Sequence, residues 1–120
     1  MQYLTPAEIF YLHSRLISET GGKADLRDWK ILKKVVSYMK NSEVFPDIFS
    51  KAGALFFAIS KKKPFSSKNT ATSLFATSLF LKINGRTLRT KESDMENFIK
   101  NHLATSPVGK ISQFLADNSN

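Results

Sequence analysis

The chain has 120 residues, 42% of them hydrophobic and ten of them phenylalanine, so it is long enough to bury one core and is not composed like a disordered segment. It contains no cysteine, which excludes disulfides and thiolate metal sites, and no run of about 18 apolar residues that could cross a membrane. Eighteen basic residues against ten acidic ones give a net charge of +8, which favours an acidic partner such as nucleic acid, a nucleotide or an acidic protein face, or simply keeps the protein soluble. Because the N-terminal residues show no signal peptide, we expect a cytoplasmic protein.

The first third of the chain carries two helical patterns. Residues 5–8 (TPAE) have the spacing of a capping box with proline in the first turn, and Gly21 and Gly22 are suited to end the helix that begins there. A second helix is expected to start near Asp25 and to run to Met39, since its apolar residues recur at helical spacing.

The middle of the chain predicts a connection followed by two further helices. Residues 41–46 form the connection, or alternatively a short extended flap near 42–46. The third helix runs from about Asp47 to Ser60. The fourth spans residues 67–84, with Ser66 or Ser67 as its N-cap. Most of its circumference is apolar, which predicts that it is the central buried helix, with Leu79 in the core.

The last part of the chain predicts two shorter helices, over residues 93–103 and 107–116, and a frayed tail over residues 117–120. No segment has the alternating pattern of a convincing strand. The fold class is therefore all-α, a single-domain bundle of about six helices spanning residues 1–120.

A basic loop joins the third and fourth predicted helices. A helix N-terminus presents unpaired N–H groups and the positive end of the helix dipole, and nearby lysines add to that field. The loop is either a solvated connection or a site for a phosphate or another anion. The candidate anion-binding residues are Lys61, Lys62, Lys63, Ser66, Ser67, Lys68, Asn69 and Thr70.

Three segments around this loop resemble the Fic/Doc family, and specifically its death-on-curing toxin branch. Residues 51–55 (KAGAL) resemble the K-A-A-x-L element of that branch, and residues 80–85 (FLKING) resemble F-L-x-x-N-G. Between them, residues 63–72 (KPFSSKNTAT) fall on the motif N-H-P-F-x-D-G-N-K-R-T-A, within a motif loop over 61–73. The first predicted helix is similar to the opening helix of the family, with its histidine at His13.

The resemblance implies an all-α fold and a transfer reaction. In the family, the motif histidine acts as a base, the acidic residue holds Mg²⁺, and the backbone at the helix N-terminus together with a Lys-Arg pair binds phosphates. Fic enzymes transfer AMP to proteins, and the death-on-curing toxin phosphorylates elongation factor Tu. ATP and Mg²⁺ would be the cofactors of such an activity.

The chain departs from the motif at nearly every position that carries chemistry. The histidine, acid, glycine, lysine and arginine positions hold Lys63, Ser67, Lys68, Thr70 and Ala71. Lysine is ordinarily protonated at neutral pH and so is a poor base, and a serine lacks the anionic oxygen that Mg²⁺ prefers. The motif residues that are kept, and that are expected to shape and pack the loop, are Phe65, Asn69 and Thr72. The chain is thus identified as a degenerate member of the family, without a metal site or an assigned catalytic residue.

Three functions are compatible with this reading. The first is a non-catalytic binding module, or pseudoenzyme, in a toxin–antitoxin or defence setting, with a protein partner that is acidic or antitoxin-like. The second is an active phosphotransferase of the death-on-curing type, whose acid or base would come from Asp47, Glu43 or His13, although packing is the expected role of His13. The third is a nucleic-acid-binding or assembly component, whose basic face would join the 61–68 cluster to Lys82, Arg86, Arg89 and Lys91.

Overall fold

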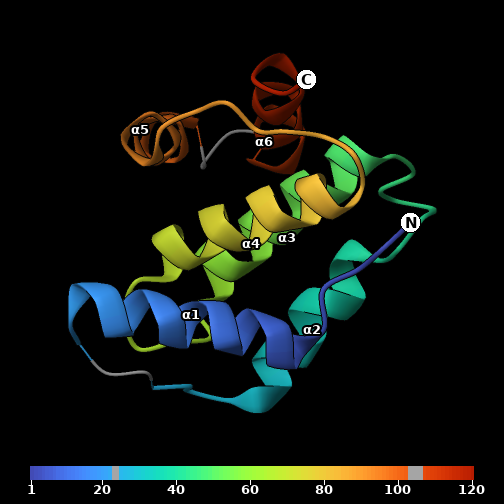
Figure 1. The fold of residues 1–120 in the computed structure, drawn as a ribbon. Coiled ribbons are helices and arrows are strands. Elements are labelled where there is room, and N and C mark those ends of the chain that lie inside the picture. Colours follow the sequence, from blue (N-terminus) through green and yellow to red (C-terminus); the bar gives the residue numbers. More distant parts are fainter. Residues whose placement is uncertain (23–24, 103–106) are drawn as a thin grey trace.

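The computed structural model describes residues 1–22, 25–102 and 107–120. These residues form six helices: α1 (Pro6–Thr20), α2 (Trp29–Met39), α3 (Ile48–Lys62), α4 (Asn69–Ile83), α5 (Glu92–His102) and α6 (Pro107–Asp117) (Figure 1). Outside the helices, the described residues contain two isolated β-bridges and no β-strand, so the predicted all-α bundle is confirmed. The predicted end of the fifth helix, Leu103, lies outside the described residues. Within these ranges, no helix has both the length and the hydrophobicity required to cross a lipid bilayer.

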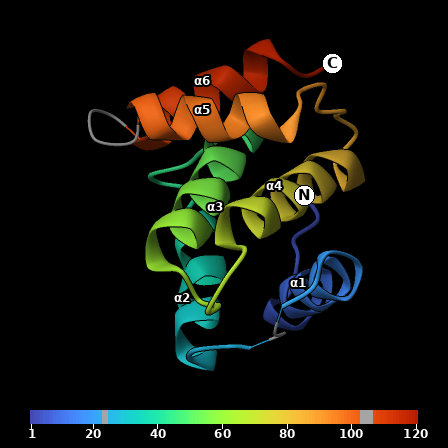
Figure 2. The ribbon, with the colours of Figure 1, turned by 90° about the vertical axis from the view of Figure 1, so that its left-hand side faces the viewer.

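The helices are arranged in three layers of two. The pair α3 and α4 lies in the middle, with α1 and α2 on one side and α5 and α6 on the other (Figures 1 and 2). Helix α2 packs on α3 and α1 packs on α4, while α6 covers the opposite side of α3. The core therefore forms around α3 and α4.

Local capping signals set the starts of α1 and α3 as predicted. The Glu8 N–H donates to Thr5 Oγ1 (3.1 Å), and the Thr5 N–H donates to Glu8 Oε1 (2.9 Å), which completes the capping box. Asp47 caps α3 in the same reciprocal way with Ser50.

The predicted start of the second helix at Asp25 is wrong. Helix α2 begins at Trp29, and Asp28 is its N-cap, with Oδ1 accepting from the Lys30 N–H at 2.9 Å. The preceding residues are extended instead, because Leu26 forms an antiparallel bridge with Phe65.

Residues 41–46 form a turned connection, and the alternative of an extended flap is wrong. Asn41 Oδ1 accepts from the N–H groups of Glu43 (3.1 Å) and Val44 (3.4 Å), which folds the segment back on itself. The turn is anchored by buried Phe45, whose ring meets Tyr38 edge-on at 4.9 Å.

Helix α3, rather than α4, is the more deeply enclosed helix. Residues 51–56 of α3 are all buried, and α3 packs against α2, α4 and α6. In α4, by contrast, Phe75 is 42% exposed and Leu79 is half-buried. Helix α4 carries apolar residues on nearly every side, and α1 leaves part of that surface uncovered.

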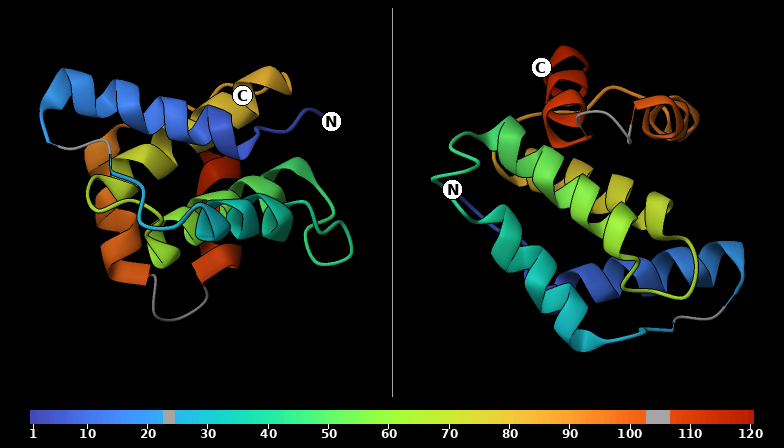
Figure 3. Two further views of the ribbon diagram at one scale, coloured as in Figure 1. Left: turned by 90° about the horizontal axis from the view of Figure 1, so that it is seen from below. Right: turned by 180° about the vertical axis from the view of Figure 1, so that it is seen from behind.

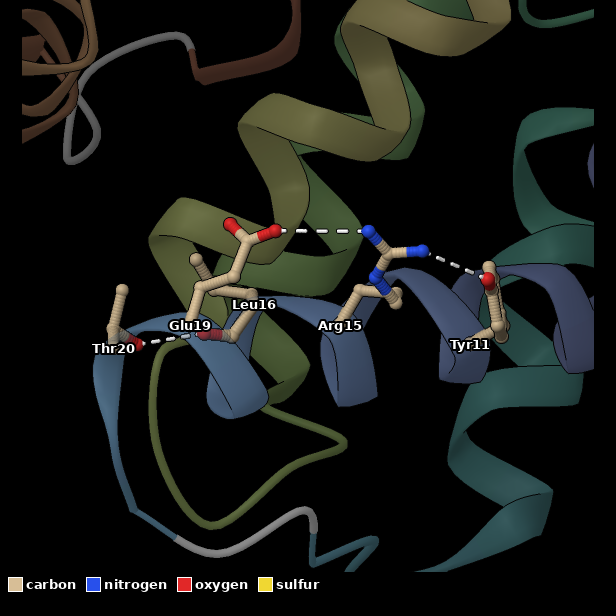
Figure 4. Close-up of polar contacts among 5 residues, drawn as sticks. All are labelled: Tyr11, Arg15, Leu16, Glu19 and Thr20. Atoms are coloured by element: carbon tan, nitrogen blue, oxygen red, sulfur yellow. Dashed lines mark hydrogen bonds and ion pairs between the residues drawn. The ribbon is translucent and has the colours of Figure 1, made fainter.

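The uncovered part of α4 borders a groove of about 310 Å³ against α1, lined in part by Leu12, Phe75 and Leu79. At its edge, Arg15 lies between Tyr11 and Glu19 (Figure 4). Its guanidinium donates to the Tyr11 hydroxyl (3.1 Å) and is 3.8 Å from the Glu19 carboxylate. The hydrogen bond to Tyr11 is the main reason that the pKa of Arg15 is raised. Because the ion pair with Glu19 is solvent-exposed, it adds little to the stability of the fold.

Lys51 is a buried cation that fastens α3 to the end of α2. Only 1% of its surface is exposed, and its ammonium donates to the Lys40 carbonyl (3.2 Å) and to the Ser42 hydroxyl (3.0 Å). The ammonium also lies 5.8 Å from the centre of the Tyr3 ring. Since Lys40 is the C-cap of α2, the positive charge sits where the helix dipole favours it.

The tail over residues 117–120, which the sequence predicts to fray, is paired with the connection after α4. The Arg89 N–H donates to the Asn118 carbonyl (2.7 Å), and the Asn120 N–H donates to the Thr87 carbonyl (3.0 Å). The N-terminal segment bonds nearby, because the Asn84 side chain pairs with the backbone of Gln2 in both directions at 2.8 Å. Asn84 is also the C-cap of α4.

Helices α3 and α6 touch at a glycine. A Cβ atom added at Gly53 would stand 3.0 Å from both the Ser112 backbone nitrogen and the Val108 carbonyl oxygen, and still closer to the Ser112 hydroxyl. Backbone atoms cannot move aside without moving α6. The close packing of α3 and α6 therefore requires a glycine at position 53.

We expect Gly53→Val to push α6 away from α3 and to lower the free energy of unfolding by about 1–3 kcal/mol, the usual range for overpacking. Urea denaturation followed by circular dichroism measures the change. Gly109→Ala in α6 is the matched control. A Cβ there meets open space, so this substitution should raise stability by about 0.5–1 kcal/mol through helix propensity. Equal stability of Gly53→Val and the parent would contradict the tight α3–α6 contact.

Candidate functional site

The candidate site is the α3–α4 loop, residues 63–68, whose two ends share an uncommon backbone conformation. Lys63 is the C-cap of α3 with φ 49°, and Lys68 is the N-cap of α4 with φ 59°. Both are left-handed, a region that glycine enters freely and that costs other residues about 1–2 kcal/mol. Position 68 therefore keeps the conformation suited to the glycine that the resemblance places there, although it carries a lysine.

Phe65 anchors the centre of the loop in the core. Its side chain is 1% exposed and stacks on the His13 ring of α1, with the ring centres 3.8 Å apart and the planes 8° from parallel. His13 Nδ1 is in turn hydrogen-bonded to Thr72 Oγ1 of α4 at 3.0 Å. His13 thus packs the loop, as predicted.

Asn69 clamps the backbone of Phe65 from the first residue of α4. Its Oδ1 accepts from the Phe65 N–H (3.1 Å), and its Nδ2 donates to the Phe65 carbonyl (2.9 Å). The motif residues Phe65, Asn69 and Thr72 therefore shape and pack the loop, as the sequence predicts.

A short extended segment before α2 runs beside the loop (Figure 3, left). The Ser66 N–H donates to the Asp25 carbonyl (3.1 Å), and the Arg27 N–H donates to the Pro64 carbonyl (2.7 Å). The Arg27 guanidinium also donates to the Lys63 carbonyl at 2.9 Å. This support could not be predicted from the sequence, because the local pattern of residues 25–28 is that of a helix start.

Most of the predicted anion-binding side chains are open to solvent. Neither Ser66 nor Ser67 is the N-cap of α4, contrary to prediction, because the loop continues to Lys68, which makes no side-chain capping bond. The exposed residues are Lys61, Lys62, Lys63, Ser66 and Lys68, and the half-buried ones are Ser67, Asn69 and Thr70. Four exposed lysines thus lie among residues 61–68, which precede the first turn of α4, and the backbone amides of that turn have no partner within the helix.

Two of the alternative acid or base residues lie far from this loop, whereas His13 packs against it. Asp47 is the N-cap of α3 and Glu43 lies in the turn before it, and the 15 residues of α3 place that N-cap roughly 22 Å from Lys63. The predicted basic face would have to extend along the whole of α4, since Lys82 is at the opposite end of that helix from Lys68. Arg86 lies beyond it, over the Phe49 ring. Across residues 1–22, 25–102 and 107–120, no group of three acidic, histidine or cysteine side chains is placed to hold a metal ion.

Replacing Asn69 by alanine should release the backbone of Phe65 and lower the free energy of unfolding by about 1–3 kcal/mol, because two partly buried hydrogen bonds are lost. Hydrogen exchange of the Phe65 amide should become faster. Ser66→Ala is the control, since this side chain is exposed and should change stability by no more than about 0.5 kcal/mol. If the Phe65 amide stays protected in Asn69→Ala, the clamp does not hold the loop.

The comparisons with known proteins agree with this geometry. The model of the Fic/DOC family matches residues 3–81, from the segment before α1 into the last turn of α4. The match includes the loop, Phe65 and its supports, whereas α5 and α6 lie beyond it. A comparison with curated proteins gave no match. Since the family model covers about two thirds of the sequence, the chain belongs to the Fic/DOC family.

Proposed function

We propose that this protein is a Fic/DOC scaffold that has lost the transfer chemistry of the family and acts as a binding module, with an anion held at the α3–α4 loop. The proposal is based on the backbone shape of this loop and on the side chains that it carries. Its backbone is clamped in a defined shape by Asn69, Phe65 and the segment 25–27, while the side chains that would do chemistry are replaced. A rigid loop without its acid and base favours binding over catalysis.

The residue types in the loop and the positions of the candidate bases both argue against transfer chemistry. Lys63 stands where the family has its base, and Ser67 stands where the family has the residue that holds Mg²⁺. His13 is fully buried against Phe65 and Thr72. A base must reach the proton that it removes, and none of the candidates Asp47, Glu43 and His13 lies in the loop.

Anion binding is supported by charge and by the helix terminus together. The first intrahelical bond of α4 runs from the Thr72 N–H to the Lys68 carbonyl (3.0 Å), so the amides of residues 69–71 precede the helical ladder. The exposed lysines of the segment that precedes these amides are Lys61, Lys62, Lys63 and Lys68. Positive charge fixed on side chains can neutralise a phosphate without a metal ion.

The wider setting of the proposal is that of the death-on-curing branch. Residues 51–55 and 80–85, which resemble that branch, form parts of α3 and of the end of α4. We therefore propose a cytoplasmic role in a toxin–antitoxin or defence system, with an acidic protein partner. Nucleic acid is the second candidate partner, since the exposed lysines around the loop suit any phosphate backbone.

Incubation with ATP, Mg²⁺ and elongation factor Tu, or with cell lysate, should transfer neither phosphate nor AMP above background. Radiolabelled nucleotide and gel analysis measure the transfer. Lys63→Ala is the matched control, because it removes the side chain at the base position and leaves the rest of the loop in place. Labelled product that forms with the parent and disappears with Lys63→Ala would support the active phosphotransferase and refute the pseudoenzyme.

Anion binding at the loop should weaken steeply with salt. If a nucleic acid binds there, Lys63→Glu combined with Lys68→Glu should remove most of the affinity and reduce the slope of log K against log salt by about 2. Titrations with ATP, single-stranded RNA and duplex DNA at low and moderate salt measure this. Lys100→Glu with Lys110→Glu makes the same charge change on exposed residues of α5 and α6 and should have little effect. Failure of all three ligands to bind would contradict an anion site in the loop.

A further inference from the structure

A second feature of the molecule is an apolar cleft of about 500 Å³ between α2 and α3. The two helices run side by side on the face seen in the right-hand view of Figure 3. Ile31 and Val35 of α2 and Phe57 and Ala58 of α3 line the cleft. Of these four, Val35 and Ala58 are buried, and Ile31 and Phe57 are half-buried. The volume lies within the range of about 300–1,000 Å³ that is typical of binding sites.

The polar groups of the cleft are one hydroxyl and two cations. Tyr38 is 40% exposed, and its burial in the structure raises the pKa of its phenol, so the hydroxyl is a hydrogen-bond donor at neutral pH. Lys34 and Lys62 complete the lining, and both are exposed. Neither α2 nor α3 contains an aspartate or glutamate, whereas the two helices together contain six lysines. The field at the cleft is therefore positive, with no carboxylate in its lining.

We propose that this cleft binds an acidic segment of a partner protein, which inserts large apolar side chains between α2 and α3 and places carboxylates beside Lys34 and Lys62. The charge of the rim selects the acidic segment, and the apolar floor selects its anchors. Only two helices line the cleft, so one side stays open. A small ligand is normally enclosed over most of its surface, whereas a peptide covers an open groove with its own backbone.

The proposal rests on the acidic protein partner proposed above and is independent of anion binding at the α3–α4 loop, although Lys62 belongs to both sets of residues. Lys34 lines the cleft and is outside the loop, and Lys68 belongs to the loop and is outside the cleft. Substitutions at these two residues therefore separate the two functions.

The test uses an array of synthetic peptides in which one or two leucine, phenylalanine or methionine anchors are flanked by glutamates. Control peptides keep the glutamates and replace the anchors by serine, or keep the anchors and replace the glutamates by lysine. Fluorescence anisotropy measures affinity with the full chain, and amide NMR shifts locate the contact. Acidic peptides with anchors should bind, should shift Ile31 and Ala58, and should bind more tightly than either control.

Charge variants then test the rim. Lys34→Glu should weaken binding of the acidic peptide about tenfold, because an attraction becomes a repulsion. Lys33→Glu makes the same charge change on the same helix but outside the cleft lining, and should weaken binding less than about threefold. Lys68→Glu should leave peptide binding nearly unchanged and weaken anion binding at the loop, whereas Lys34→Glu should do the reverse. Circular dichroism melting verifies that each variant is folded.

Three outcomes would overturn the proposal. Equal binding of the serine-substituted peptides would show that only charge attracts the peptide. Binding of the fatty acid laurate in the cleft, with no peptide of the array binding, would show a site for a small amphiphile. Absence of shifts at Ile31 and Ala58 under saturating acidic peptide would place any binding elsewhere.

Discussion

The arrangement of the candidate site depends on the burial of Phe65. This one side chain follows α3, stacks on His13 of α1, pairs through its backbone with the segment before α2, and is clamped by Asn69 of α4. Four helices are thus fixed relative to each other through a residue that belongs to none of them. Because its side chain is 1% exposed, the loop that carries it cannot shift without opening the core. The shape of the loop is therefore a property of the fold, and it persists while the residues around it change.

This constraint explains how substitutions in the loop can leave its geometry unchanged. Of the residues that differ from the family motif, Lys63 and Lys68 are exposed, Ser67 and Thr70 are half-buried, and Ala71 is buried. The residues that are kept are buried or clamp the backbone. Left-handed backbone at Lys68 shows that the turn is imposed by its surroundings, since a lysine has no preference for it. Substitutions at the exposed positions of this loop can therefore change its charge while its shape is kept.

The sequence predicts those parts of the structure that depend on neighbours in the chain. The capping box at Thr5 is read correctly, and so is the start of α3 near Asp47, because the partners that set these helix starts lie within a few residues. The start of α2 and the N-cap of α4 are missed because residues 25–27 and 64–66 bond to each other across a long sequence separation. The half-burial of Leu79 is missed because α4 is apolar all round, so nothing in its pattern tells which side α1 leaves open. Within the site, Phe65, Asn69 and Thr72 could be predicted, whereas the support from Arg27 could not.

The two ends of the chain are both bonded to the connection between α4 and α5. Gln2 pairs with Asn84, and residues 118–120 pair with Thr87 and Arg89. Both ends are thus held at the same segment of the fold, residues 84–89. Detachment of either end would weaken the contacts that the other end makes with this connection, so the two ends should open cooperatively. This arrangement also suits circular permutation, in which residues 1 and 120 are joined and new ends are made in the turn at residues 41–46.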